Sequence, residues 1–438
     1  MASTSALAEN VRKIPQRERG PWQFLPLKLA LVWLFGTLVV FFMTEQATRV
    51  PAIGPLLAVA IGGASFLAIG YILTVRRERR ASTVRTESRK VPNGLVLAAG
   101  CWSIIYALAI LRYQQLGMGD ILQALSNPGQ AYKAKFEVFA RAEVDPLTQL
   151  ATLGSGFMTI TTPVTIAWWR ELSPWSRLVG VLGSLAFPLA FVGIGTNQGL
   201  GYAFLFMLVG VLVGFYHRNP GWRRPRLPKK AQLAILLALV AGLAFFVLGS
   251  ITRSSEFQAE RAPTNPLVSS LVGEDLSLAF DSVVFYPTHG YLGLSETLTQ
   301  PFVFTQGYGG TRAANRYMVG YFGATDQFAN TYPARTEYDR GYPSLALWHT
   351  IYPWLASDLT FPGAVIFMAA VGWLMARTWL MSVTSRDPLA IGLLAYLAIF
   401  VVFIPANNQI GTSQVNLIGF LSLFAIYVLR WVFRFERT

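Results

Sequence analysis

The feature that most constrains this sequence is a series of long apolar runs separated by shorter polar segments. Charged residues make up only 13% of the chain, about half of the roughly 25% found in soluble domains. About 20 apolar residues are enough to cross a bilayer as a helix. We therefore predict an all-α polytopic membrane protein with about ten transmembrane helices, near residues 29–44, 52–75, 94–111, 150–168, 178–194, 200–216, 233–251, 361–380, 389–404 and 415–432.

The distribution of basic residues predicts the orientation of these helices. With the N-terminus inside, the inner segments hold 25 of the 36 Lys and Arg residues, including the basic loops 76–90 and 217–230. Short basic loops remain on the cytoplasmic side, so we expect both termini to be cytoplasmic. The net charge of +14 then faces anionic lipid headgroups, and we expect no nucleic acid partner. The predicted parts are a cytoplasmic tail (1–28), helices 1–7 with an outer loop at 112–148 (29–251), a large extracytoplasmic loop (252–359), and helices 8–10 with a cytoplasmic tail (360–438).

The large loop between the seventh and eighth predicted helices carries an unusual set of cations. It contains six arginines and no lysine. The planar guanidinium binds phosphate or carboxylate through two parallel hydrogen bonds, which lysine cannot do. These arginines therefore indicate a phosphate site, although pairing with nearby carboxylates such as Glu256, Glu260, Glu337 and Asp339 remains the alternative. The candidate phosphate ligands are Arg253, Arg312, Arg316, Arg335 and Arg340.

The same loop is rich in aromatic residues and has no pattern typical of a metal site. Its tyrosines and tryptophans can stack on sugar rings or form an aromatic belt at the membrane surface; the candidates for glycan contact are Tyr286, Tyr291, Tyr308 and Trp348. His289 and His349 are 60 residues apart and do not form a zinc-binding motif. The single cysteine, Cys101, excludes a cysteine metal cluster. We expect neither a metal nor a cofactor.

Three patches of the chain resemble one known family. Tyr286 to Leu294 followed by the glycine-rich Gln306 to Gly310 is similar to the O-antigen polymerase (Wzy-type) family. Trp348 to Thr350, leading through Asp358 and Gly363 into an apolar helix, has the same resemblance, as does Leu125 to Tyr132. The resemblance implies a GT-C-like fold, with a large, partly helical outer loop between helices 7 and 8. It also implies a metal-independent glycosyltransferase that uses polyprenyl-pyrophosphate-linked sugars on the outer face of the bacterial inner membrane.

Within this family, the growing glycan would pass from its polyprenyl pyrophosphate to a hydroxyl of the next lipid-linked repeat unit. The arginines would stabilise the leaving pyrophosphate, and the acceptor hydroxyl needs a base. His289 ranks first as this base, and the other catalytic candidates are Glu296, His349 and Asp358. A chain-length regulator or a flippase is a candidate partner. Two alternatives remain open: a ligase that transfers finished glycan to another acceptor, and a flippase or exporter, which the scarcity of charged residues in the spans disfavours.

Overall fold

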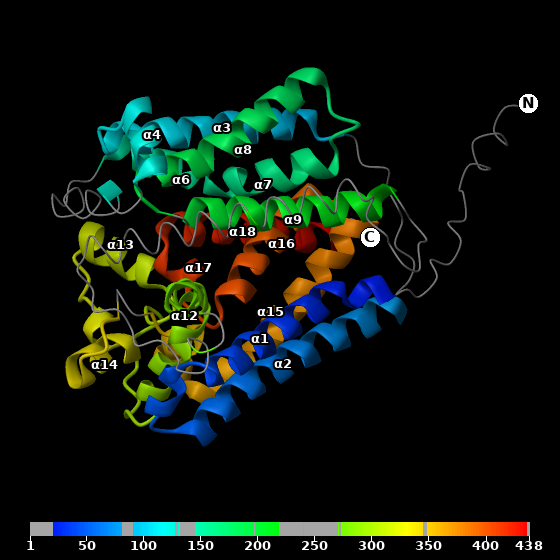
Figure 1. The fold of residues 1–438 in the computed structure, drawn as a ribbon. Coiled ribbons are helices and arrows are strands. Elements are labelled where there is room, and N and C mark those ends of the chain that lie inside the picture. The colour runs from blue at the N-terminus through cyan, green and yellow to red at the C-terminus, as the bar shows by residue number, and fades with distance from the viewer. Residues whose placement is uncertain are drawn as a thin grey trace, which may run out of the picture.

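The protein is a helical bundle in a computed structural model, which describes residues 21–80, 91–127, 130–131, 145–196, 198–218, 273–344 and 348–435, with Val240 and Ser270 (Figure 1). Within these ranges every regular element is a helix. The expected seventh span (233–251) lies outside them except for Val240, and so does Arg253. The described helices confirm an all-helical, multi-pass membrane protein.

Six of these helices are long and apolar enough to cross a membrane. They are α1 (Leu25–Phe42), α2 (Ile53–Arg80), α3 (Asn93–Tyr113), α8 (Pro174–Gly193), α9 (Gln198–Arg218) and α15 (Ile351–Thr384). A bent pair, α6 (Pro146–Leu153) and α7 (Ser155–Ala167), makes up to seven. Two further described helices have shorter apolar stretches: α16 (Pro388–Phe403), and α18 (Gln414–Phe435) over Gln414–Arg430.

Close helix packing in the bundle depends on glycine at a few crossing points. A Cβ added at Gly372 of α15 would lie 2.0 Å from the carbonyl oxygen of Leu67 on α2. The bend of 50° between α6 and α7 occurs at Gly154, where an added Cβ would lie 1.9 Å from Nε1 of Trp102. Without a hydrophobic driving force between helices in lipid, such small residues allow the backbones to approach.

Helix α15 is broken near its first third, and this break shapes the region described below. Thr360 has φ 63° and ψ 166°, a conformation rarely adopted by a β-branched residue. Pro362 follows two residues later, and its ring would clash with the carbonyl of Asp358 if the helix continued. The break separates a first part, Ile351–Leu359, which is mostly buried up to Ser357, from a longer apolar part that ends at Thr384.

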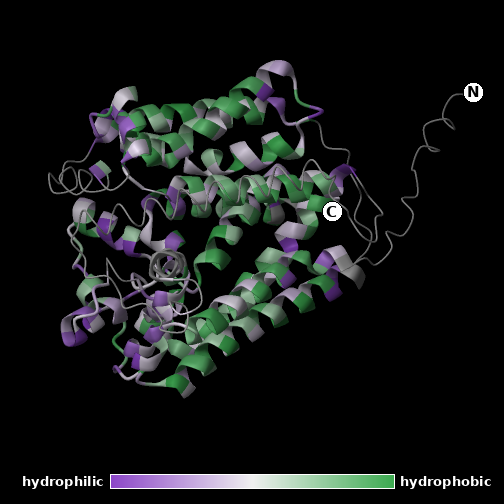
Figure 2. Ribbon diagram, viewed as in Figure 1, coloured by the Kyte–Doolittle hydropathy of each residue, from purple (hydrophilic) through white to green (hydrophobic). Residues whose placement is uncertain are grey.

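The smaller helices gather at one end of the bundle. These are α4 (Met118–Ser126), α13 (Arg312–Phe322) and α14 (Tyr332–Arg340), whereas α1 begins and α18 ends at the opposite end (Figure 1). Helix α12 (Glu274–Thr297) packs against α1 and α14. Hydrophilic residues concentrate at the two ends, and the helices between are mostly apolar (Figure 2). Apolar side chains there are also exposed, such as Val32, which is 74% exposed, as expected for a lipid-facing surface.

Candidate functional site

A glycine-rich turn at residues 306–310 is held in place by one carboxylate. Asp358, at the end of the first part of α15, accepts a hydrogen bond at Oδ1 from the Thr305 hydroxyl (2.6 Å) and from the Gly307 amide (2.8 Å). Its Oδ2 accepts from the Gly310 amide (3.0 Å). Hydrogen bonds to a charged group are stronger than neutral ones. Asp358 therefore fixes the backbone that leads directly into α13.

Helix α13 is also docked onto the apolar bundle by amide side chains. Asn408 Nδ2, just before α17 (Gln409–Thr412), donates to the carbonyl of Gly310 (2.8 Å). Tyr317 of α13 donates its hydroxyl to Gln149 Oε1 (3.0 Å), and Gln414 of α18 donates to the same oxygen. The turn before α13 is thus tied to Asn408, and the second turn of α13 is tied to Gln149 of α6, which Gln414 of α18 also contacts.

Arg312 begins α13 and is positioned by an aromatic ring instead of an ion pair. Its guanidinium lies over the ring of Phe328, 4.5 Å from the centroid, and Phe328 stacks in turn on Trp354. Among the described residues, no hydrogen bond or salt bridge involves the Arg312 guanidinium. Burial lowers the pKa of Arg312, and the charge of Arg316 acts in the same direction. The ring face fixes the guanidinium plane, and no described residue accepts a hydrogen bond from its five N–H donors.

The other expected phosphate ligands divide into two kinds. Arg316 lies one turn after Arg312 on α13, is exposed, and also makes no ion pair with a described residue. Arg335 instead donates to the carbonyls of Asn330 (3.2 Å) and Pro301 (2.9 Å). Arg340 donates to Glu296 (2.6 Å) and to Thr299 (2.6 Å). The structure therefore brings Arg312 and Arg316 together with their donors available, whereas Arg335 and Arg340 are engaged by the protein.

The four candidate catalytic groups also differ in what surrounds them. The carboxylates of Glu296 and Asp358 already accept hydrogen bonds from the protein. His289 is 3% exposed; its Nδ1 lies 2.9 Å from the Phe285 carbonyl, and its Nε2 has no partner. His349 is fully buried, and neither ring nitrogen has a partner. Burial lowers the pKa of His289 to about 4 and that of His349 to about 3. Both rings are neutral at pH 7.

These buried rings predict how stability depends on pH. An unfolded histidine has a pKa of 6.5, so between pH 6.5 and about 3 the unfolded chain binds protons that the folded chain does not. Stability should fall with falling pH by about 1.4 kcal/mol per pH unit for each such ring. Thermal unfolding in detergent should show this slope, and His349→Phe, which keeps a ring against Tyr342, should reduce it. Equal slopes in the two proteins would mean that His349 contributes nothing to the pH dependence.

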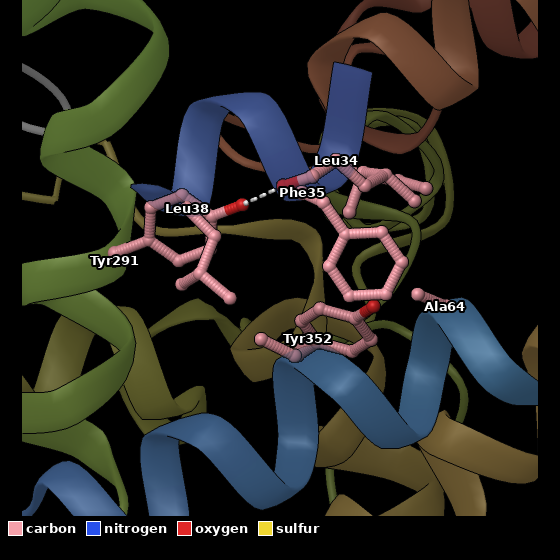
Figure 3. A pocket seen from close by; sticks show the side chains of 8 residues that line it. Leu34, Phe35, Leu38, Ala64, Tyr291 and Tyr352 are labelled. Atoms are coloured by element: carbon pink, nitrogen blue, oxygen red, sulfur yellow. Dashed lines mark hydrogen bonds between the residues drawn. The ribbon is translucent and has the colours of Figure 1, made fainter. Parts of the chain in front are cut away.

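The four candidate aromatic residues occupy different surroundings. Tyr286 and Trp348 are partly exposed and lie edge to face, with ring centroids 5.2 Å apart, beside His289. Tyr308 is partly exposed in the glycine-rich turn. Tyr291 is 2% exposed and donates its hydroxyl to the Leu34 carbonyl (3.3 Å). It lines an apolar pocket between α1, α2, α12 and α15 with Phe35, Ala64 and Tyr352 (Figure 3), so the structure places it in the apolar interior.

Comparison with known protein families, with curated proteins and with solved structures finds no match to this chain. Within the part of the chain that the structure describes, no three His, Cys, Asp or Glu side chains lie close enough together to share a metal ion. Sequence reasoning missed Phe328 and Asn408, which position Arg312 and the turn before it. The polar run Asn407-Asn408-Gln409 between two apolar helices is a signal that could have identified Asn408, whereas nothing in the sequence singles out Phe328.

Proposed function

We propose that this chain is a polysaccharide polymerase that transfers a growing glycan from polyprenyl pyrophosphate to the next lipid-linked repeat unit. The observation that carries the proposal is the state of Arg312, a partly buried guanidinium fixed by Phe328 with its N–H donors available. A cation held in this way suits an anion bound from outside the chain. Arg316, one turn away, supplies a second positive charge for a diphosphate. The resemblance of the surrounding patches to O-antigen polymerases supports the same ligand.

The proposed reaction requires cations that stabilise the leaving pyrophosphate and a base that accepts the proton of the acceptor hydroxyl. The acceptor hydroxyl attacks the anomeric carbon of the donor sugar while the bond from that carbon to the phosphate oxygen breaks, with inversion. The electron pair of that bond goes to the leaving polyprenyl pyrophosphate, whose developing charge Arg312 and Arg316 stabilise. The hydroxyl proton goes to a base. We assign this role to His289, which lies in the motif that resembles the O-antigen polymerases and whose Nε2 has no partner.

The depth of this site in the membrane agrees with a lipid-linked substrate. The part of α15 after Thr360 runs to Thr384, a rise of about 36 Å at 1.5 Å per residue, which covers a hydrocarbon core of roughly 30 Å. Asp358, just before the break, would then lie at headgroup level together with the turn that it holds. We propose that this is the outer face of a bacterial inner membrane, with both termini in the cytoplasm and a flippase or chain-length regulator as partner.

The direct test is polymerisation by the purified protein. With a polyprenyl-pyrophosphate repeat unit as the only substrate, we expect a ladder of longer glycans, and the ladder should persist after chelation of divalent metals because arginines supply the positive charge. Loss of the ladder with rescue by magnesium would contradict the metal-independent mechanism. A single transfer to a different acceptor, with no ladder, would indicate a ligase, and movement of the lipid without any transfer would indicate a flippase.

A further inference from the structure

The segment Pro301–Phe304 is an exposed apolar stretch outside the spanning helices. Phe302 is 44% exposed, Val303 36% and Phe304 58%, and none of the four residues carries a charge or a polar side chain. Contiguous apolar residues on a folded surface usually mark an interaction site. Here they lie beside the functional site, since Thr305 and the glycine-rich turn follow directly.

Both ends of this apolar segment are fixed to the protein. At one end, Arg335 donates to the Pro301 carbonyl (2.9 Å). At the other, the Thr305 amide and hydroxyl donate to the Ser357 carbonyl of α15 (3.2 and 3.1 Å). Because hydrogen bonds anchor both ends of the segment, its backbone holds the side chains of Phe302, Val303 and Phe304 in place. Their exposure is a property of the fold.

The attachment to α15 sets the depth of the segment. Ser357 lies one turn before the break at Thr360, and the helix after that break is long enough to cover the hydrocarbon core. Leu359, beside the break, is itself 42% exposed, so the apolar surface of α15 continues up to the segment. Among the described residues, the backbone of Phe302–Phe304 makes no hydrogen bond, which limits its depth, because unpaired backbone is excluded from the hydrocarbon interior.

We infer that Phe302, Val303 and Phe304 insert into the headgroup–acyl boundary of the adjacent leaflet and form a membrane contact next to the glycine-rich turn that leads into Arg312. The occupant is lipid because the segment continues the lipid-facing surface of α15 at the boundary depth. The inference does not depend on the proposed enzymatic activity. If that activity holds, this contact places the arginines against the leaflet from which a lipid-linked diphosphate would arrive.

The chain has a single cysteine, Cys101, which makes site-directed labelling straightforward. In a Cys101→Ser background, Phe304→Cys carries a nitroxide, and the full chain is placed in nanodiscs of phosphatidylethanolamine and phosphatidylglycerol. Spin-label saturation by oxygen, which enters lipid, is compared with saturation by a water-soluble nickel chelate. Matched controls are Tyr338→Cys on α14, 92% exposed, and Val32→Cys on α1, 74% exposed.

The Phe304 label should favour oxygen several-fold over nickel, less strongly than the Val32 label, whereas the Tyr338 label should favour nickel. Nickel accessibility at Phe304 equal to that at Tyr338 would overturn the inference. A label shielded from both reagents would also overturn it, because that result indicates a protein occupant. Val303→Cys provides a second probe if the first variant does not fold, and elution as a single species by size-exclusion chromatography verifies folding for each variant.

Discussion

Arg312→Ala should lower the rate of glycan polymerisation at least tenfold, the largest activity loss expected from any single arginine in the described loop. Removal of one preorganised donor to a developing negative charge costs on the order of 10²-fold in rate in well-studied enzymes. Arg312 has such donors available and is held by Phe328 at 4.5 Å. The effect should appear mainly in kcat, because the leaving pyrophosphate carries more charge in the transition state than in the bound substrate.

Three matched variants make this prediction specific. Arg335→Ala removes a guanidinium that is engaged by the backbone carbonyls of Asn330 and Pro301 and by the Tyr332 ring, so it should reduce stability more than kcat. Arg312→Lys keeps the charge but loses the planar fork, and should recover only part of the rate. Phe328→Leu should leave Arg312 present but less well oriented, with an intermediate rate. Near-normal turnover in Arg312→Ala and in Arg316→Ala would place the phosphate site elsewhere.

The sequence was sufficient to predict the membrane class but not the site. Apolar runs must be helical in lipid because each backbone group needs a partner, and this gave the spans around α1, α2 and α3. The number of spans is harder to derive: hydropathy counts 150–168 and 389–404 as two spans, whereas in the structure the first is a pair of helices bent by 50° and the second, Pro388–Phe403, is a shorter apolar helix.

The motif between Tyr286 and Leu294 shows a second limit. The motif was recognised only by its residue types, and the structure places it inside the continuous helix α12, with Pro287 in the helix. The glycines serve close packing: a Cβ added at Gly290 would lie 2.2 Å from the Pro405 carbonyl oxygen, and one at Gly293 would lie 3.0 Å from the Tyr342 ring. Such contacts join residues distant in sequence, and composition does not reveal them.

The arginines illustrate why the choice among site residues needed coordinates. All of the candidates are the same residue type in one loop, and sequence distinguishes them only by local charge. Arg340 is paired with Glu296, 44 residues away, although Asp339 is its immediate neighbour. Arg312 lacks such a partner within the described chain and lies on an aromatic ring 16 positions further along. Availability of a guanidinium therefore depends on long-range packing.

Asp358→Asn should release the glycine-rich turn, and this tests whether Asp358 positions the site or acts as the base. The asparagine amide keeps an acceptor for Thr305 and Gly307 but presents N–H groups toward the Gly310 amide, so one charge-assisted bond becomes a donor–donor contact. Hydrogen bonds to charged groups contribute about 1.5–3 kcal/mol each. We expect faster amide hydrogen exchange at Gly307 and Gly310, a lower unfolding temperature, and a loss of turnover similar to that of Arg312→Ala, because α13 begins at this turn.

Asp339→Asn, at an exposed carboxylate on α14 with one long contact to Gln300 (3.5 Å), is the matched control and should change none of these quantities. A catalytic base would behave differently: turnover would be abolished while exchange at the turn stayed as slow as in the wild type. Slow exchange with lost activity would therefore indicate that Asp358 acts as the catalytic base. Fast exchange with lost activity would assign Asp358 to holding, through its three hydrogen bonds, the backbone that leads into Arg312.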